Sequence, residues 1–474
     1  MNGWSRGVAP AAVTSDAERR RARLLAAAVA VTGALLIATE QILTLIWTAA
    51  SYPGPVEYVA PDGTLTVVSS LDDNFHYQAR HVSGLSEYLS QPGLLGGATL
   101  VPALLAVTVL VFAVQALRIG TVARERRLAA FSLAGATRRQ LRRLAAREGT
   151  RAAVRGALLA GPAYLVLWLL LGVLAPDGWK LLPPLDWTAA VTWVLVVPLL
   201  GLLGGLVSAR TARTAEVSPL GITRRAPRAL TWRTVAVPVV SLTVCLAFLV
   251  YAFRTYAQQW VILLGIVAAV VFCLSLGPLA VVGLGRLAVR SDRLETALAG
   301  RRLLADPRPS GRVAGVLFAV GLTLGFEAYL AVGVLREPGY TADDLAFYLG
   351  GVAIVGVAAV LSALVACLSM VVAASEQVLE GRRGVAVLVS LAASPGFALS
   401  VVRRQLRIVA VPLALTGAVI GLVALGLGDP VSTLAGLPAL LVVYLLGRGG
   451  AALAARAVAP VVRECSGPEN LRAA

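Results

Sequence analysis

The stretch RERRLAAFSLAGATRRQLRRLAAREG runs from Arg124 to Gly149 and contains eight arginines and two glutamates. Long apolar runs lie on both sides of it, at Ala98–Leu117 and Ala152–Ala175. An apolar run of about 20 residues can span about 30 Å of hydrocarbon as a helix. The stretch is therefore predicted to connect two membrane spans on the side of the membrane that collects positive charge.

The composition of the whole chain agrees with membrane insertion. Of the 474 residues, 58% are hydrophobic and only 14% are charged, and the mean hydropathy is +0.80. Soluble domains carry about 25% charged residues. The apolar runs predict an all-α integral membrane protein with ten transmembrane helices at approximately Leu24–Ala49, Ala98–Leu117, Ala152–Ala175, Thr188–Ala209, Val235–Phe253, Trp260–Gly285, Val313–Leu335, Phe347–Ala374, Ile408–Gly428 and Leu437–Ala455.

Positive charge is distributed unevenly between the segments that connect these spans. With a cytoplasmic N-terminus, 38 of the 42 Lys and Arg residues fall in cytoplasmic segments. The four in outer loops are Arg80, Lys180, Arg254 and Arg336. This asymmetry follows the positive-inside rule and predicts cytoplasmic N- and C-termini in a plasma-membrane protein. It also accounts for the net charge of +17 without nucleic acid.

A second copy of the quoted motif follows 258 residues later. Phe131–Ala136 reads FSLAGA, and Val389–Ser394 reads VSLAAS. A charged patch precedes each copy, and an arginine pair with a glutamine follows each, at Arg138–Gln140 and Arg403–Gln405. Recurrence at the same topological place indicates an internal duplication. The prediction is two parallel four-span repeats with a connecting pair of spans between them.

The domain organisation follows from this duplication. In the outer loop 50–97, Val56–Val59 and Thr64–Ser69 flank Pro61–Gly63 and are predicted to pair as a small hairpin. The expected segments are a cytoplasmic segment at 1–23, a first repeat at 24–234, a connecting pair with a cytoplasmic loop at 235–312, a second repeat at 313–455 and a cytoplasmic tail at 456–474.

The duplicated motif resembles the FtsX-like permeases, the membrane subunits of MacB-type ABC exporters and their relatives. The resemblance rests on Arg124–Thr137, followed by Gln140, Glu148, Gly156 and Gly161. It implies a permease whose basic cytoplasmic segments dock on a separate ABC ATPase, expected in two copies. ATP hydrolysis there would drive export of an amphiphilic substrate or transmit force across the membrane. The second copy departs from the pattern with Ala393 in place of glycine.

The residues of the first basic segment fit such a docking helix on their own terms. Leu141, Leu144 and Ala145 form a narrow apolar stripe, and arginines cover the remaining faces. A helix of this kind docks on a protein or lies against anionic lipid headgroups. The resemblance assigns ATPase coupling to Arg124, Glu125, Leu133, Gly135, Ala136, Arg138, Arg139, Gln140, Leu141 and Arg142 in the first copy, and to Arg382, Arg383, Ser394, Arg403, Arg404 and Gln405 in the second.

A nucleotide site within this chain is excluded by its single lysine. A P-loop needs a lysine directly after glycine, because the backbone amides and the lysine together hold the phosphates. Lys180 instead follows Trp179 and is predicted to lie on the outer face. We therefore expect no catalytic residues and no cofactor bound by this chain, with ATP and Mg held by the partner ATPase.

The outer loop 50–97 contains both histidines of the chain. Their spacing with the nearby aspartates matches no recognised metal-ligand pattern, so a solvated loop is expected rather than a metal site. The loop is also a possible contact for an extracellular partner. The residues concerned are Asp72, Asp73, His76 and His81.

Glu40 and Glu327 are the acidic residues predicted to lie within the hydrocarbon, in the first span of each repeat. Such residues face a bundle interior, a partner or water. They either line a substrate path or form a structural pair that orients helices. Buried glutamates also leave open an ion-gradient-driven secondary transporter, and the outer loop leaves open a non-transporting FtsX-like regulator of a cell-wall enzyme.

Gly321–Gly325 and Gly417–Gly421 are predicted to pack helices closely.

Overall fold

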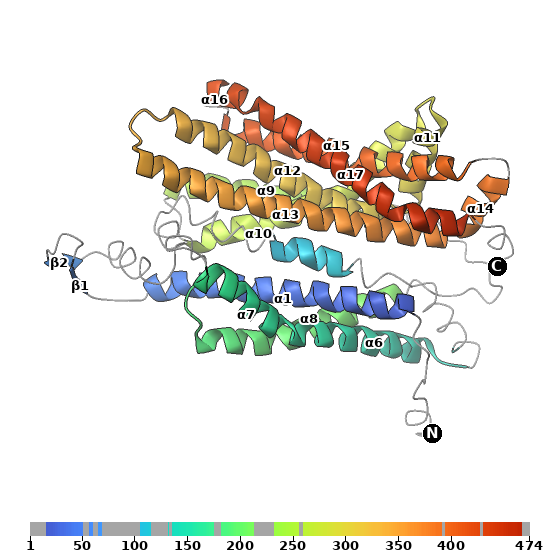
Figure 1. Cartoon of the computed structure of the whole chain (residues 1–474), viewed down its shortest axis with the longest axis horizontal. Coiled ribbons are helices and arrows are strands. Elements are labelled where there is room, and N and C mark those ends of the chain that lie inside the picture. Colours follow the sequence, from blue (N-terminus) through green and yellow to red (C-terminus); the bar gives the residue numbers. More distant parts are fainter. Residues whose placement is uncertain are drawn as a thin grey trace, which may run out of the picture.

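The structure is a computed structural model in which long helices lie side by side along the longest axis (Figure 1). It describes residues 16–50, 56–59, 65–68, 105–114, 131, 135–174, 182–212, 232–255, 259–390, 394–426 and 430–466. The labelled helices are α1 (Asp16–Ala50), α6 (Arg138–Leu158), α7 (Ala160–Trp168), the π-helix η1 (Leu169–Val173), α8 (Trp187–Ala212), α9 (Trp232–Thr255), α10 (Gln259–Val289), α11 (Leu294–Ala305), α12 (Pro307–Arg336), α13 (Ala342–Glu380), α14 (Arg382–Ser390), α15 (Pro395–Gly426), α16 (Pro430–Ala435) and α17 (Leu437–Cys465).

The predicted all-helical membrane architecture is confirmed in its main features. Within the described residues, eight helices are long and apolar enough to cross a membrane. Two shorter apolar helices, at Leu105–Val114 and Thr234–Phe248, fall on two further predicted spans. Every predicted span therefore coincides with one helix or with a series of helices among the described residues.

The third predicted span is divided between three helical segments, whereas the sequence predicted one continuous helix. α6 ends at Leu158, α7 begins at Ala160, and η1 follows from Leu169. Pro162 has no backbone N–H to donate to the carbonyl of Leu158, so the regular hydrogen-bond ladder cannot continue through this point. The amide of Leu174 then donates to the carbonyl of Leu169 at 2.8 Å, which is the wider spacing of a π-helix.

The hairpin predicted in the outer loop is confirmed. β1 (Val56–Val59) pairs antiparallel with β2 (Leu65–Val68), and Val56 lies opposite Val68. In Figure 1 this hairpin lies at one end of the molecule, and α11 and α14 lie at the opposite end together with the start of α6.

One helical bundle is formed by α1, α6, α7 and α8. α6 packs along α8 and crosses α1, and small residues line both contacts. A methyl group at Gly204 would overlap Ala153, and one at Gly156 would overlap Val29. Small residues at such positions allow helix backbones to approach closely within a membrane.

A second bundle is formed by α9 to α17, with α12 at its centre. α12 packs against α10, α13 and α15. Gly321 and Gly325 face the carbonyls of Ala414 and Ala418, and Gly417 in turn faces the carbonyl of Phe318. The predicted close packing through these glycines is confirmed, and it is reciprocal between α12 and α15.

The helix at Leu105–Val114 touches both bundles. Ala113 is buried in the core of the first bundle, and Phe112 packs against the same core. Val111, on another face of the same helix, packs against the core of the second bundle. In Figure 1 this short cyan helix lies between α1 and the second bundle, so it joins the two bundles.

Candidate functional site

The first basic segment contains a sharp turn at Gly135. Its φ angle is +88°, a left-handed conformation that glycine adopts without the steric penalty of a side chain. The amide of Ala136 donates to the carbonyl of Phe131 at 2.9 Å. A bond of this spacing together with a left-handed glycine is the pattern of a Schellman motif. We call Gly135–Thr137 the elbow.

A capping box begins the helix that follows the elbow. The amide of Gln140 donates to Oγ1 of Thr137 at 3.4 Å, and the amide of Thr137 donates to Oε1 of Gln140 at 2.7 Å. These bonds satisfy amides that have no partner within the helix. Gln140, which the resemblance assigned to coupling, therefore also fixes where α6 starts.

The first turns of α6 present a positive surface to solvent. Arg139, Arg143 and Arg147 are exposed, and Arg142 is half-buried. Of the predicted apolar stripe, Ala145 is buried at 1% exposure, but Leu144 is 37% exposed. The stripe is thus only partly covered by the chain itself. Exposed arginines around an exposed leucine form a surface that a protein partner with acidic groups can cover.

The same helix continues from this surface into the first bundle without a break until Leu158. Below the arginines, a methyl group at Gly149 would overlap the backbone of Gly204, and one at Gly205 would overlap the hydroxyl of Thr150. Such close contacts leave little room for α6 to slide independently of α8. A displacement of the elbow would therefore be transmitted to the membrane-crossing part of the bundle.

The second basic segment, which contains Arg382, Arg383 and Arg403–Gln405, differs from the first in the residues at the start of its helix. Ser394 caps α15, since the amide of Phe397 lies 3.2 Å from Oγ of Ser394. The eight residues after this cap are PGFALSVV, whereas the eight after Thr137 are RRQLRRLA. When the two helices are aligned on their caps, Arg403 and Arg404 lie two turns further along α15 than Arg138 and Arg139 lie along α6.

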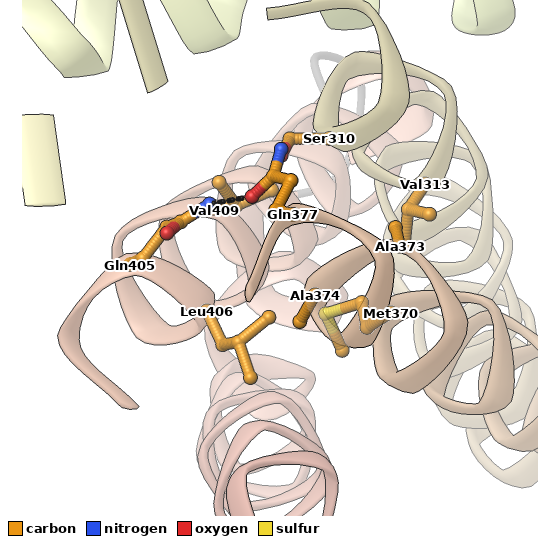
Figure 2. A pocket seen from close by; sticks show the side chains of 9 residues that line it. All are labelled: Ser310, Val313, Met370, Ala373, Ala374, Gln377, Gln405, Leu406 and Val409. Carbon is orange, nitrogen blue, oxygen red and sulfur yellow. Dashed lines mark hydrogen bonds between the residues drawn. The ribbon is translucent and has the colours of Figure 1, made fainter. Parts of the chain in front are cut away.

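Gln405 does not lie on a docking surface, contrary to the sequence expectation. Its side chain is 4% exposed, and Nε2 donates to Oε1 of Gln377 on α13 at 2.7 Å. Figure 2 shows this bond beside a small pocket between α12, α13 and α15. Counted from the cap, Gln405 occupies the place of Glu148 rather than that of Gln140. The sequence motif therefore aligned glutamines that have different structural roles.

α11 covers part of the start of α15. Oγ of Ser400 lies 2.7 Å from Oε1 of Glu295 on α11, and Leu303 of α11 is fully buried against α10, α12 and α15. Burial lowers the pKa of Arg302 on the same helix, because desolvation disfavours its charged form. Ser400, six residues after the cap of α15, therefore contacts α11. Arg143, six residues after the cap of α6, is instead exposed.

The two intramembrane glutamates have different surroundings and belong to different bundles. Glu40 accepts hydrogen bonds from Gln41 Nε2 at 2.9 Å and from Thr44 Oγ1 at 2.7 Å. Gln41 Nε2 also donates to Thr188 on α8 at 3.0 Å. Glu327 on α12 is 8% exposed, and its Oε2 has no hydrogen-bond partner within the described part of the chain.

Several predicted site residues fall outside what the structure describes. Among the described residues, no group of His, Cys, Asp or Glu side chains is arranged to hold a metal ion. Positions outside the described residues are Arg124, Glu125, Leu133, Asp72, Asp73, His76, His81 and Lys180, and the side chains of Arg138, Arg382 and Arg383 also lie outside them.

Residues 99–217 match the family model described as FtsX-like permease C-terminal. The matched range contains the helix at Leu105–Val114, the elbow, α6, α7 and α8. No curated protein and no solved structure matched the chain. By this match, residues 99–217 of the chain are similar to the FtsX-like permeases.

Proposed function

We propose that the chain is the permease subunit of an ABC transporter in the plasma membrane, driven by a separate cytoplasmic ATPase. The observation that carries this proposal is the surface at the start of α6, where a glycine elbow and a capping box present exposed arginines. ATP and Mg bind to the partner ATPase rather than to this chain. Hydrolysis there drives export of an amphiphilic substrate or transmits force across the membrane.

Continuity of α6 with the first bundle gives the coupling a physical route. Arg139 and Arg143 lie within the first two turns, and the close contacts of Gly149 with α8 begin about two turns later. A partner that moves the elbow therefore moves α6 and α8 as one unit. This motion changes how the first bundle sits against the helix at Leu105–Val114, and hence against the second bundle.

Helix packing supports the proposed arrangement of two parallel repeats. In each bundle the first helix crosses the third, as α1 crosses α6 and α7 and as α12 crosses α15. The third helix in turn packs against the fourth, α8 or α17. With α9 and α10 as the added pair, the chain has ten spans and both termini in the cytoplasm. Two ATPase copies are proposed, one beneath each bundle.

The two docking surfaces are proposed to be unequal. The start of α6 offers exposed arginines, whereas the start of α15 is neutral and partly covered by α11. An ATPase copy beneath the second bundle would therefore contact a composite surface that includes α11. Charge reversal on α6 should consequently weaken binding more than charge reversal on the second segment does.

Co-purification tests this function directly. The wild-type protein and the Arg139→Glu/Arg143→Glu variant are solubilised in mild detergent and captured, and co-purifying proteins are identified. We expect a P-loop ATPase with the wild type and its loss from the variant. Arg456→Glu/Arg463→Glu is the matched control, since both side chains are exposed on α17 and lie outside α6 and α11. Folding of each variant is checked by size-exclusion chromatography.

The same experiment separates the alternatives. If a monodisperse wild-type protein captures no ATPase, the ABC proposal fails, and an ion-gradient-driven carrier that uses Glu327 becomes the better explanation. If an ATPase is captured but reconstituted vesicles move no amphiphile, the complex acts as a regulator that transmits force. An equal loss of ATPase from the control variant would assign binding to general charge rather than to α6.

A further inference from the structure

A cluster of four arginines lies between α15 and α17, away from the elbow. Arg403, Arg404 and Arg407 lie on α15, and Arg448 lies on α17. Arg407 follows Arg403 and Arg404 by about one helical turn, and Gly447, next to Arg448, packs against Val411 one turn beyond Arg407, so the four residues lie close together. Tyr444 lies beside them, and its hydroxyl accepts a hydrogen bond from Arg448 at 2.9 Å. We call these five residues the arginine cluster.

No negative group described in the structure balances this cluster. Arg407 is half-buried, and its Nε is inaccessible to solvent and has no hydrogen-bond partner among the described residues. Arg403 and Arg448 are exposed, so the cluster opens to the outside of the bundle. Four like charges without a counter-charge repel one another, and guanidinium groups bind phosphate through several donors at once. The arrangement therefore suits a bound phosphate group, because none of the described side chains supplies the negative charge.

The depth of the cluster places it at one boundary of the hydrocarbon. Arg407 lies 19 residues before Gly426, the last residue of α15. That length of helix is about 28 Å, close to the thickness of a bilayer core. Gly447 packs beside Val411, so Arg448 lies about one turn further into the membrane than Arg407. A phosphate at this depth belongs to a lipid headgroup rather than to a soluble ion.

An apolar surface continues from the cluster towards the other side of the membrane. Leu441 and Leu445 precede Arg448 at helical spacing on α17, and they are 60% and 55% exposed. They provide a surface on which an acyl chain can lie while the headgroup stays at the arginines. From this juxtaposition we propose that the arginine cluster is a binding site for an anionic glycerophospholipid of the inner leaflet, with its phosphate between α15 and α17.

This proposal is independent of ATPase docking on α6. It gives Arg403 and Arg404 a different role from the one that the family resemblance implied. Basic pockets between transmembrane helices on the cytoplasmic side are known to hold anionic headgroups. A lipid held between α15 and α17 would tie the third and fourth helices of the second bundle together. It would leave the first bundle unaffected.

Native mass spectrometry of the purified full-length protein tests the site. The protein is titrated with phosphatidylglycerol or phosphatidylcholine in detergent, and bound lipid is counted. We expect one phosphatidylglycerol to bind more tightly than phosphatidylcholine. In Arg407→Gln/Arg448→Gln this preference should fall roughly 10- to 30-fold, since each arginine near an anionic lipid contributes about 1 kcal/mol. Arg290→Gln/Arg293→Gln removes the same charge elsewhere and should keep the preference.

Further variants keep the test decisive. If Arg407→Gln/Arg448→Gln is not monodisperse, Arg407→Lys/Arg448→Lys replaces it, with a smaller loss expected because lysine keeps the charge but not the planar donors. Equal affinity for the two lipids, or an equal loss in the control, overturns the proposal. Competition by millimolar glycerol phosphate as strong as that by phosphatidylglycerol also overturns it, since the site would then bind soluble anions.

Discussion

The hydroxyl of Ser400 at the start of α15 lies 2.7 Å from Oε1 of Glu295 on α11. The same hydroxyl lies 2.7 Å from the carbonyl oxygen of Phe397, and its single proton can be donated to either acceptor. Arg143 occupies the corresponding place in α6 and is exposed. The start of α6 is therefore an exposed surface, while the start of α15 is joined to α11, a helix of the loop that follows the connecting pair.

Removal of this contact should loosen α11. In Glu295→Ala, α11 loses its polar tie to α15 but keeps the burial of Leu303. A hydrogen bond to a charged group contributes about 1.5–3 kcal/mol. Amide hydrogen exchange across 294–305 should become at least about fivefold faster, and exchange in α6 should not change. Asp292→Ala is the control, since Asp292 is exposed just before α11. Equal exchange in the two variants would contradict a stabilising role for the contact.

The elbow should depend on the backbone of Gly135 rather than on space around it. A methyl group there would meet no atom within 4 Å, but the φ angle of +88° is strained for any other residue. Gly135→Ala should destabilise the turn by about 1–2 kcal/mol, and Gly135→Asn by less. Exchange of the Ala136 amide measures this directly, since that amide donates to Phe131.

A matched glycine provides the control for the elbow. Gly396 lies in the first turn of α15 and is exposed, and a methyl group there makes only an ordinary contact with Ser394. Gly396→Ala should leave exchange at the start of α15 unchanged or slower, because alanine favours a helix. If Gly135→Ala behaves in the same way, the left-handed turn has no structural role.

Loss of the capping box should fray the start of α6. Thr137→Ala removes the side chain that accepts from the Gln140 amide. Caps of this kind contribute about 1 kcal/mol, so exchange in the first turn should rise roughly fivefold, and ATPase capture should weaken because Arg139 and Arg143 lose their fixed positions. Thr137→Ser keeps the acceptor and should behave like the wild type. Unchanged exchange in Thr137→Ala would show that packing on α8 alone orders the turn.

The spans, the hairpin and the glycine contacts could be predicted because each depends on local sequence. A long apolar run crosses hydrocarbon as a helix, because a helix gives its backbone amides hydrogen-bond partners within the same segment. Pro61–Gly63 between alternating residues specifies a hairpin, and Gly321 with Gly417 marks a close crossing. The break near Pro162 also has a local cause, since proline lacks the amide that the helix interior requires.

The burial of Gln405 could not be predicted, because it depends on a helix cap. Aligning the repeats by their Arg-Arg-Gln triplets puts Gln405 beside Gln140, but aligning them by Thr137 and Ser394 puts it beside Glu148. Only the structure shows which residue starts each helix. The cover that α11 gives α15 is a tertiary contact between residues 105 positions apart, which no local pattern encodes.

The two intramembrane glutamates should respond oppositely to replacement by leucine. Glu40→Leu removes the acceptor of hydrogen bonds from Gln41 and Thr44, so it should destabilise the first bundle by about 1–3 kcal/mol. Glu327→Leu removes a carboxylate whose Oε2 has no described partner, so thermal stability in detergent should stay equal or rise. An equal loss of stability in both variants would mean that Glu327 has a partner that stabilises it.

Close packing between α12 and α15 should be the most sensitive feature of the second bundle. A side chain at Gly321 would overlap the backbone carbonyl of Ala414, and backbone cannot rotate away as a flexible side chain can. Gly321→Leu must therefore separate the two helices, and overpacking of this kind costs about 1–3 kcal/mol or more. Gly333 lies on the same helix, and a methyl group there meets no atom within 4 Å. Gly333→Leu should accordingly leave the thermal unfolding temperature in detergent unchanged, whereas Gly321→Leu lowers it. Equal unfolding temperatures for the two variants would mean that the α12–α15 crossing does not hold the bundle together.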